Sequence, residues 1–295
     1  MTIALALREA AAALAAVSDT PRLDAELLMA EALGVPRSEV LLRHLAAPPP
    51  REFAASLARR LRHEPVAHIL GRQEFYGHDL IVTADVLIPR GDSETLVEAA
   101  RGAFAGRAPP ARVLDLGTGS GALLVAALAL WPRATGIGSD RSLAALAVAA
   151  ANAARLGLAG RARLLRRDWE TPGWRTGLAR FDLILANPPY VEDAAALAPQ
   201  VRRFEPAGAL YAGPDGLAAY RRLIPELPHL LAPGGTAVVE IGASQAGAVA
   251  ALAAAAGLEA VVHRDLAGLP RALALKKSLG KPGDPDYFES KPADG

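Results

Sequence analysis

The stretch RVLDLGTGSGALLVAALALW, residues 112–131, decides the fold. It opens with an apolar segment typical of a buried strand, passes through a turn that holds three glycines, and continues as an Ala- and Leu-rich segment typical of a helix. Glycine suits such a turn because a Cβ atom would block a ligand and because some positions need a positive φ angle. The stretch therefore predicts a strand, a ligand-binding turn and a helix of an α/β domain.

Strand-like and helix-like segments alternate along the chain from residue 110 onward. The expected strands cover residues 112–116, 134–139, 163–166, 181–186, 235–241 and, near the end, 258–264. Such alternation is typical of a largely parallel sheet, and open sheets of this kind bind ligands at the carboxyl ends of their strands. We expect one α/β domain over residues 110–278, with its functional residues at that edge.

The N-terminal part of the chain follows a different pattern. Apolar residues recur at helical spacing over residues 2–62, where Thr20 should cap a helix that begins at Pro21. Three consecutive prolines, residues 48–50, should interrupt the helices. We expect about four short helices and a helical domain over residues 1–72.

A linker is expected between these two parts, over residues 73–109. Aromatic and β-branched residues around Gly77 predict a β-hairpin within residues 74–88, and Asp92 with Ser93 should cap the helix that follows. At the other end of the chain, residues 279–295 are polar and rich in Pro and Gly, so we expect a disordered tail there.

Composition narrows the classes of function. Lys and Arg total 32 against 31 Asp and Glu, and the net charge of +1 gives no overall attraction to nucleic acid or to anionic membranes. The chain has no Cys, which excludes disulfides and thiolate sites and makes the cytoplasm the default compartment. The longest apolar runs are shorter than the roughly 20 residues of a membrane span. We expect a cytoplasmic protein without a membrane or direct nucleic-acid partner, and a monomer by default.

The glycine turn alone leaves its ligand open, because G-x-G-x-x-A at residues 117–122 also fits a dinucleotide-binding fingerprint. Asp140, at the end of the second strand, can accept hydrogen bonds from the ribose hydroxyls that NAD and S-adenosylmethionine share. After the third strand, Asp168 can accept the adenine amino group and Trp169 can pack on the adenine ring. The expected cofactor-binding residues are Gly117, Thr118, Gly119, Ser120, Gly121, Asp140, Asp168, Trp169 and Asn187.

The fourth strand favours S-adenosylmethionine, since it delivers Asn187, Pro188, Pro189 and Tyr190 at its carboxyl end. A planar NH2 group is a poor nucleophile because its lone pair is delocalised. The Asn187 side-chain oxygen and the Pro188 carbonyl can each accept one N–H bond and so aim that lone pair, while Tyr190 packs on the planar group. The expected catalytic residues are Asn187, Pro188 and Tyr190, and Pro189 joins them in binding the substrate. S-adenosylhomocysteine would be the product, and no metal is needed.

Further segments resemble the HemK or PrmC family of release-factor glutamine methyltransferases. They are RLDAELL at residues 22–28, EPVAHILG at 64–71, EFYG at 74–77, LIPR at 87–90 and RFEP at 203–206. The chain departs from the family's usual linker, IPRPDTE, because Gly91 replaces the second Pro and Ser93 replaces Thr. We expect this change to affect domain orientation or stability more than substrate class.

The resemblance implies a Rossmann-like class I methyltransferase domain with a mostly parallel seven-stranded sheet, joined to the N-terminal helical domain by the β-hairpin linker. It also implies methyl transfer to the side-chain amide nitrogen (N5) of the Gln in the Gly-Gly-Gln loop of bacterial peptide release factors, with residues 1–72 binding the release factor. Two other acceptors stay open. One is a ribosomal-protein Gln, and the other is the N6 amine of adenine in nucleic acid, because a flipped base also presents a planar NH2 group.

Overall fold

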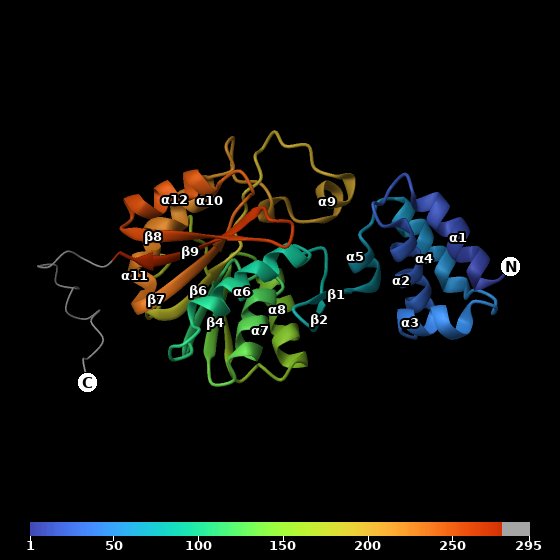
Figure 1. Cartoon of the computed structure of the whole chain (residues 1–295), viewed down its shortest axis with the longest axis horizontal. Coiled ribbons are helices and arrows are strands. Elements are labelled where there is room, and N and C mark those ends of the chain that lie inside the picture. Colours follow the sequence, from blue (N-terminus) through green and yellow to red (C-terminus); the bar gives the residue numbers. More distant parts are fainter. Residues whose placement is uncertain (279–295) are drawn as a thin grey trace, which may run out of the picture. The chain divides into compact units, whose positions relative to one another are not determined.

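The computed structural model describes residues 1–278 of the 295-residue chain (Figure 1). The segment expected to be a disordered tail, residues 279–295, lies outside the described residues. The chain divides into two compact units. Unit 1 comprises Met1–Gln73, Val82–Ala84 and Ala196–Glu205, and unit 2 comprises Glu74–Ile81, Asp85–Ala195 and the described chain from Pro206 onward.

Unit 1 is built from helices. They are α1 Ile3–Leu14, α2 Pro21–Leu33, α3 Arg37–Glu39, the π-helical segment Val40–His44, α4 Arg51–Leu61, α5 Val66–Leu70 and α9 Pro199–Phe204. Leu7, Leu28 and Phe53 belong to a buried core made within this unit. The expected helices of residues 2–62 and their interruption by the three prolines are therefore confirmed.

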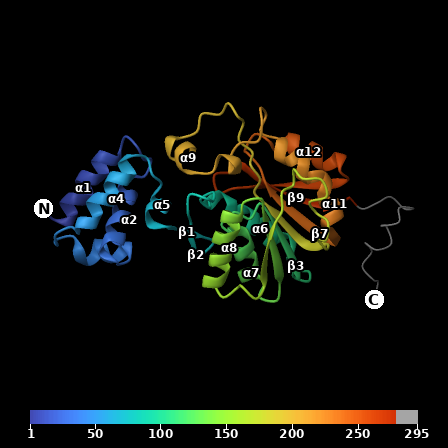
Figure 2. The same ribbon diagram turned by 180° about the vertical axis from the view of Figure 1, so that it is seen from behind.

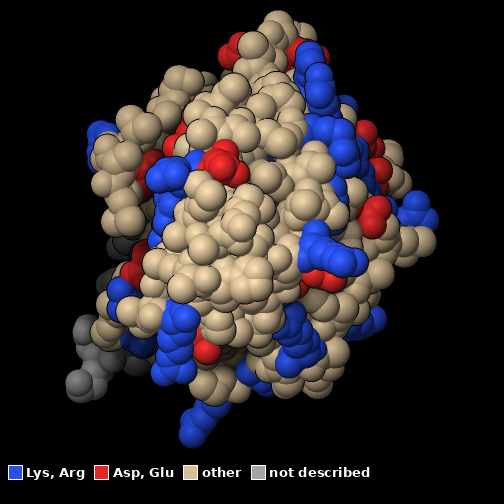
Figure 3. Space-filling view, turned by 90° about the vertical axis from the view of Figure 1, so that its right-hand side faces the viewer, with Lys and Arg blue, Asp and Glu red and all other residues tan. Residues whose placement is uncertain are grey.

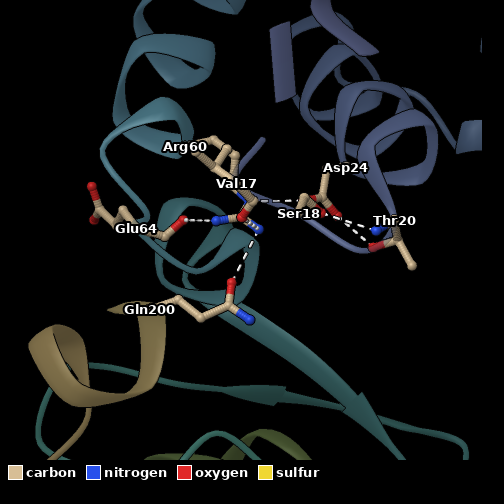
Figure 4. A network of polar contacts seen from close by, with 7 residues as sticks. All are labelled: Val17, Ser18, Thr20, Asp24, Arg60, Glu64 and Gln200. Atoms are coloured by element: carbon tan, nitrogen blue, oxygen red, sulfur yellow. Dashed lines mark hydrogen bonds and ion pairs between the residues drawn. The ribbon is translucent and has the colours of Figure 1, made fainter. Parts of the chain in front are cut away.

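Thr20 occupies the expected N-cap position of α2, but its side chain does not cap the helix. Pro21 is the first helical residue, but the Thr20 side chain makes no capping hydrogen bond to the helix backbone. Its hydroxyl instead donates to Asp24 Oδ1 at 3.0 Å, and the Ser18 hydroxyl donates to Asp24 Oδ2 at 2.7 Å (Figure 4). A buried carboxylate is stabilised only when hydrogen-bond donors replace its lost water. The Thr20 hydroxyl serves as such a donor to Asp24 and therefore does not accept from the first turn of the helix.

Arg60 lies at the centre of the network in Figure 4. Its Nε donates to Asp24 Oδ2 at 2.7 Å, and its Nη2 donates to the Val17 carbonyl at 3.2 Å and to Gln200 Oε1 at 3.0 Å. Gln200 lies in α9, 140 positions further along the chain than Arg60. The contact fastens α9 to the helices of unit 1, which accounts for the place of that distant segment in this unit.

A two-stranded sheet confirms the expected hairpin. Its strands are β1 Arg72–Phe75 and β2 His78–Ile81. Tyr76 and Gly77 between them have φ angles of 50° and 77°. Positive φ at both central residues is the requirement of a type I′ turn, whose twist matches that of the flanking strands. The turn therefore lies at Tyr76 and Gly77, within the segment expected to form the hairpin.

The large sheet of unit 2 has seven strands in the order β5-β4-β3-β6-β7-β9-β8. Their bounds are β3 Arg112–Leu116, β4 Thr135–Asp140, β5 Ala162–Arg166, β6 Phe181–Ala186, β7 Leu231–Glu240, β8 Leu258–Arg264 and β9 Pro270–Lys277. The first five strands in this order are parallel, and β9 runs antiparallel to both of its neighbours. The expected mostly parallel, Rossmann-like seven-stranded sheet is confirmed.

The residues alone predicted six of these strands and missed β9. Its sequence, PRALALKK, begins with a proline and ends with two lysines, which weakens a strand signal read one segment at a time. In the structure β9 lies between β7 and β8, and its central residues are buried from both sides. β9 is stabilised by hydrogen bonds to β7 and β8, and the sequence of the β9 segment alone does not predict this pairing.

Helices cover the two faces of this sheet (Figures 1 and 2). On one face α6 Glu94–Ala103, α7 Ala122–Leu130 and α8 Leu143–Arg155 pack on side chains such as Val113 and Leu183. On the other face α10 Ala218–Leu223, α11 Leu227–Leu230 and α12 Ala246–Ala255 pack on the alternate side chains, such as Leu114 and Ile184. Successive strand residues thus enter different cores, as the period of two requires. Within residues 1–278, no helix combines the length and apolar character that crossing a membrane requires.

Candidate active site

A cavity of about 330 Å³ opens in unit 2 where the parallel strands end. It is lined by nine of the expected site residues, namely Gly117, Thr118, Gly119, Ser120, Asp140, Asp168, Trp169, Asn187 and Pro189. Three other expected residues, Gly121, Pro188 and Tyr190, do not belong to the lining. The structure therefore brings together residues from the ends of four different strands.

The linker also lines this cavity, which sequence reasoning missed. Phe75, Val86, Leu87, Pro89 and Ser93 all belong to the wall. The LIPR segment at residues 87–90 resembles the family's linker, and that resemblance predicts a connection between domains but not a cavity wall. Its apolar side chains supply the kind of wall that small-molecule sites share.

The glycine turn allows a ring to lie close to the backbone. Gly117, Gly119 and Gly121 all have positive φ angles, of 72°, 54° and 82°. A Cβ atom on Gly117 would lie 2.9 Å from the Trp169 ring, so only glycine leaves room for the indole. A Cβ on Gly121 would instead lie 3.2 Å from the Ala149 Cβ. Gly121 therefore serves the packing of the turn on α8, while Gly117 and Gly119 face the cavity.

Asp140 ends β4 and is tied to the glycine turn. Its Oδ2 accepts the Gly119 N–H at 3.0 Å, and its Oδ1 accepts the Ser142 N–H at 2.9 Å. Each carboxylate oxygen retains a further lone pair for a ligand hydroxyl. Asp168 is held in a similar way, since its Oδ1 accepts the Glu170 N–H at 3.0 Å. Both carboxylates are therefore fixed by backbone donors and face the same cavity.

A third carboxylate, Asp115, lies beneath the turn, and sequence reasoning missed it. It is 1% exposed, and its Oδ2 accepts a hydrogen bond from the Thr118 hydroxyl at 2.6 Å. Burial raises the pKa of this carboxyl group to about 7, although the Thr118 bond opposes that rise. The group braces the turn from below rather than facing the cavity.

Asn187 follows the last residue of β6 and is oriented by Ser93. The Asn187 Nδ2 donates to the Ser93 Oγ at 3.2 Å. Because the amide is planar, its Oδ1 then lies on the opposite arm, away from Ser93. Ser93 occupies the expected N-cap position of α6, but it also ends the 3-10 turn Gly91–Ser93, has helical backbone angles and makes no capping bond with its side chain. The hydroxyl is thus free to bond to Asn187.

Tyr190 is held from two sides. Its hydroxyl donates to Glu240 Oε1 at 3.3 Å, and its backbone carbonyl accepts from Gln245 Nε2 at 3.0 Å. Burial and the nearby Glu240 carboxylate raise the pKa of Tyr190 to about 12, so the phenol stays a neutral donor near neutral pH. Pro188, between Asn187 and Tyr190, is buried.

Glu240 is the second functional candidate that sequence reasoning missed. It is the last residue of β7 and is 1% exposed. Its Oε1 accepts from Tyr190, its Oε2 has no hydrogen-bond partner within residues 1–278, and the neighbouring Ser93 side chain favours the ionised form of the carboxyl group. Burial raises the pKa of Glu240 to about 7. The available signal was its position, since it closes a parallel strand at the same edge of the sheet as Asp140 and Asn187.

No cluster of three or more His, Asp or Glu side chains able to hold a metal ion occurs within residues 1–278. The polar residues that line the cavity are instead the separate carboxylates Asp85, Asp140 and Asp168, the guanidinium groups of Arg141 and Arg167, the Asn187 amide and the hydroxyls of Ser93, Thr118, Ser120 and Ser142. This set of groups suits an organic ligand with hydroxyl and amino groups.

Comparison with known proteins gives two matching family models. Residues 6–71 match the PrmC N-terminal domain, and residues 109–262 match a methyltransferase domain. The resemblance seen in the sequence motifs is thereby confirmed.

Individual relatives match over nearly the whole chain. A release factor glutamine methyltransferase of Cereibacter sphaeroides is 46% identical over 284 residues, which cover 94% of this chain and 99% of the relative. One of Rhodospirillum rubrum is 43% identical over 281 residues, which cover 93% of this chain and 85% of the relative. A solved structure of a release-factor-specific protein-(glutamine-N5) methyltransferase from Alicyclobacillus acidocaldarius is 29% identical and covers 67% of this chain and 98% of its own. Its TM-score of 0.39 is too low for a comparison of geometry.

Proposed function

This chain belongs to the release factor glutamine methyltransferase family, and on that premise we propose that it methylates the N5 amide nitrogen of the Gln in the Gly-Gly-Gln loop of a bacterial peptide release factor. The observation that carries this proposal is the Asn187 amide at the cavity wall, with its nitrogen held by Ser93 at 3.2 Å. That arrangement leaves the amide oxygen to accept an N–H bond from a substrate. A translation factor as substrate implies that the reaction takes place in the cytoplasm.

The cavity fits S-adenosylmethionine, which supplies an electrophilic methyl group on a sulfonium centre. A volume of about 330 Å³ lies in the usual range of small-molecule sites. We assign the ribose hydroxyls to Asp140, whose oxygens are fixed by Gly119 and Ser142. The adenine amino group is assigned to Asp168, and the ring to Trp169 above Gly117. Thr118, Ser120 and the rest of the turn would contact the remaining part of the donor.

Catalysis would consist mainly of aiming the substrate nitrogen. Asn187 Oδ1 and the Pro188 carbonyl would each accept one of its N–H bonds, and Tyr190 with Pro189 would hold the amide plane. With the donor bound, its sulfonium group would supply the methyl group to the nitrogen that these residues hold. The proton released from the nitrogen would pass to water, and the products would be S-adenosylhomocysteine and the methylated amide. Positioning of this kind can supply roughly 7 to 11 kcal/mol.

Unit 1 is the part that we assign to the release factor. Its helices form a core of their own, and its sequence matches the PrmC N-terminal domain over residues 6–71. We further propose that residues 1–72 act as the binding domain, that residues 73–109 act as a linker, and that the protein works as a monomer.

Nucleic acid is the acceptor that this proposal disfavours. On the face drawn in Figure 3, Lys and Arg side chains are scattered over a mostly uncharged surface, with acidic side chains among them. The net charge of +1 agrees with that distribution. Nucleic-acid binding depends strongly on clustered phosphate contacts.

The decisive experiment supplies labelled S-adenosylmethionine and one acceptor at a time. The acceptors are a release factor, the same factor with its loop Gln replaced by Ala, a ribosomal-protein preparation, and DNA. We expect label on the intact release factor alone. Label on the Ala variant would contradict the assigned residue, and label on DNA or ribosomal protein alone would replace the proposed substrate.

A further inference from the structure

We propose that Glu240 is a positioning residue of the methyl transfer, because its carboxylate fixes the direction of the Ser93 hydrogen bonds and thereby the orientation of the Asn187 amide. The role in turnover rests on the proposed function, whereas the coupling between these side chains can be measured without it. Three side chains from separate parts of unit 2 form this relay: Ser93 precedes α6, Asn187 follows β6 and Glu240 ends β7.

The contacts place Ser93 between the other two side chains. Its Oγ accepts from the Asn187 Nδ2 at 3.2 Å, and its side chain neighbours the Glu240 carboxyl group, whose buried Oε2 has no hydrogen-bond partner within residues 1–278. Ser93 and Glu240 are 4% and 1% exposed, so water does not compete freely for these bonds. Tyr190 joins the same carboxylate through its hydroxyl at 3.3 Å. One buried group therefore contacts both Tyr190 directly and Asn187 through Ser93.

The chemistry of the hydroxyl gives the relay a direction. An ionised carboxylate can only accept, so the Ser93 hydroxyl must donate its one proton to Glu240. The Ser93 oxygen can then only accept, and Asn187 must turn its NH2 group toward it. The Asn187 oxygen is consequently left for the substrate. A protonated Glu240 can itself donate to Ser93, which frees the Ser93 proton to attract the Asn187 oxygen and removes this preference.

Burial has the largest effect on the Glu240 carboxyl group and disfavours its ionised form, and the charged groups around it act in both directions. Arg271 favours the ionised form, but it also pairs with Asp92 at 3.1 Å and with Asp265 at 3.0 Å. Asp92 disfavours a second negative charge, and burial disfavours it further. Tyr220 donates to the Glu240 backbone carbonyl at 2.9 Å, which fixes the strand end rather than the charge. Because the resulting pKa of Glu240 is about 7, protonation of Glu240 and the reorientation of Ser93 and Asn187 that follows should occur near neutral pH.

The chain offers an unusually clear measurement of the relay, because it contains two asparagines, Asn152 and Asn187. Labelling Asn alone with 15N therefore gives two side-chain NH2 signals. Asn152 is fully buried and donates to the Ile81 and Ser120 carbonyls at 3.0 and 2.8 Å, which makes it an internal reference. Comparison with the Asn187→Ala variant assigns the two signals. The measurement is made on the full chain and needs neither methyl donor nor release factor.

We expect the Asn187 signal to shift with pH, with a midpoint near 7, and the Asn152 signal to stay in place. Glu240→Gln should abolish that shift. Ser93→Ala should uncouple Asn187 from Glu240, and Ser93→Thr, which restores a hydroxyl, should recover the coupling. An Asn187 signal that does not respond to pH, or that responds equally in Glu240→Gln, would overturn the proposal. If Glu240→Gln does not fold, the two Ser93 variants test the same coupling, and an equal pH response in both would overturn it as well.

Kinetics then test the consequence for turnover. With the release factor as substrate, kcat should fall below pH 7 in the unmodified chain. Glu240→Gln should lose this acid limb and lower kcat by about tenfold to a hundredfold, as a misplaced reacting group does, with KM for the methyl donor within about twofold. Glu259→Gln, which changes an exposed carboxylate on β8, is the matched control and should leave kcat unchanged. If the unmodified chain does not methylate the release factor, the proposed function fails while the amide spectra still decide on the relay.

Discussion

Arg60 and Asp24 form an ion pair inside unit 1, with 2.7 Å between Nε and Oδ2 and with only 4% and 8% of the two side chains exposed. Replacing one partner of such a pair leaves the other charge buried and unpaired. We expect Arg60→Met to destabilise unit 1 by about 3 to 5 kcal/mol. Hydrogen exchange of the α2 and α4 amides, resolved by peptide, measures that loss within unit 1 itself.

Arg72→Met is the matched control for this prediction. Arg72 also pairs with a carboxylate, Glu31, but the two side chains are 44% and 38% exposed. An exposed pair contributes about 0 to 1 kcal/mol, so exchange in unit 1 should hardly change. If the two substitutions destabilise unit 1 equally, burial of the Arg60 pair does not increase its contribution to the stability of the unit.

Asn187→Ala separates binding of the methyl donor from turnover. The variant removes the oxygen that is proposed to accept a substrate N–H bond, and the loss of one oriented group commonly costs about 2.7 to 4 kcal/mol. We expect kcat to fall by about a hundredfold to a thousandfold. Calorimetric affinity for S-adenosylhomocysteine should stay within a few-fold, because Asp140, Asp168 and the glycine turn remain. Near-normal turnover would contradict the role of Asn187.

The parts of the site that sequence could predict are those with a local pattern. The glycine turn follows directly from its strand, and Asp140 and Asn187 each follow an apolar strand, so a rule about strand ends locates them. Ser93 shows the limit of such rules. Its sequence context predicts a helix cap, and only the folded sheet brings Asn187, 94 positions away, next to its hydroxyl.

The missing parts of the fold have the same physical cause. β9 pairs with strands on both sides, and Gln200 reaches Arg60 across 140 positions. Neither relationship leaves a periodic signal in the segment itself. Glu240 falls within the expected strand of residues 235–241, and its burial beside Tyr190 and Ser93 depends on three segments meeting. These features are therefore determined by contacts between segments far apart in the sequence, and the pattern within a single segment does not predict them.

Gly117→Ala tests the close approach of Trp169 to the turn. The new Cβ would lie 2.9 Å from the indole ring and at a φ angle of 72°. We expect the ring to be displaced from the cavity wall and affinity for S-adenosylhomocysteine to fall by at least about tenfold, since about 1.4 kcal/mol of lost binding has that effect. Isothermal titration calorimetry measures the change.

The control for Gly117 is Gly157→Ala. Gly157 has nearly the same φ angle, 71°, but a Cβ there would meet nothing within 4 Å. Both substitutions therefore carry the left-handed strain of about 1 to 2 kcal/mol, and only Gly117→Ala carries the clash. Unchanged affinity in both variants would argue against a donor site beside Trp169.

Asp115 should make the stability of unit 2 depend on pH. Burial raises its pKa from 3.8 to about 7, so in this range the folded protein binds a proton that the unfolded chain releases. The stabilising effect of that proton is complete below about pH 4 and is lost as the pH rises toward the folded-state pKa near 7. One such group changes the unfolding free energy by at most about 1.4 kcal/mol per pH unit.

Asp115→Asn keeps an acceptor for the Thr118 hydroxyl but cannot ionise. We therefore expect the unfolding free energy of Asp115→Asn minus that of the unmodified chain, measured by denaturant titration, to grow between about pH 4 and pH 7 and then to level off. A difference that is flat with pH, or that shrinks, would mean that the Asp115 carboxyl group is ionised in the folded protein throughout this range.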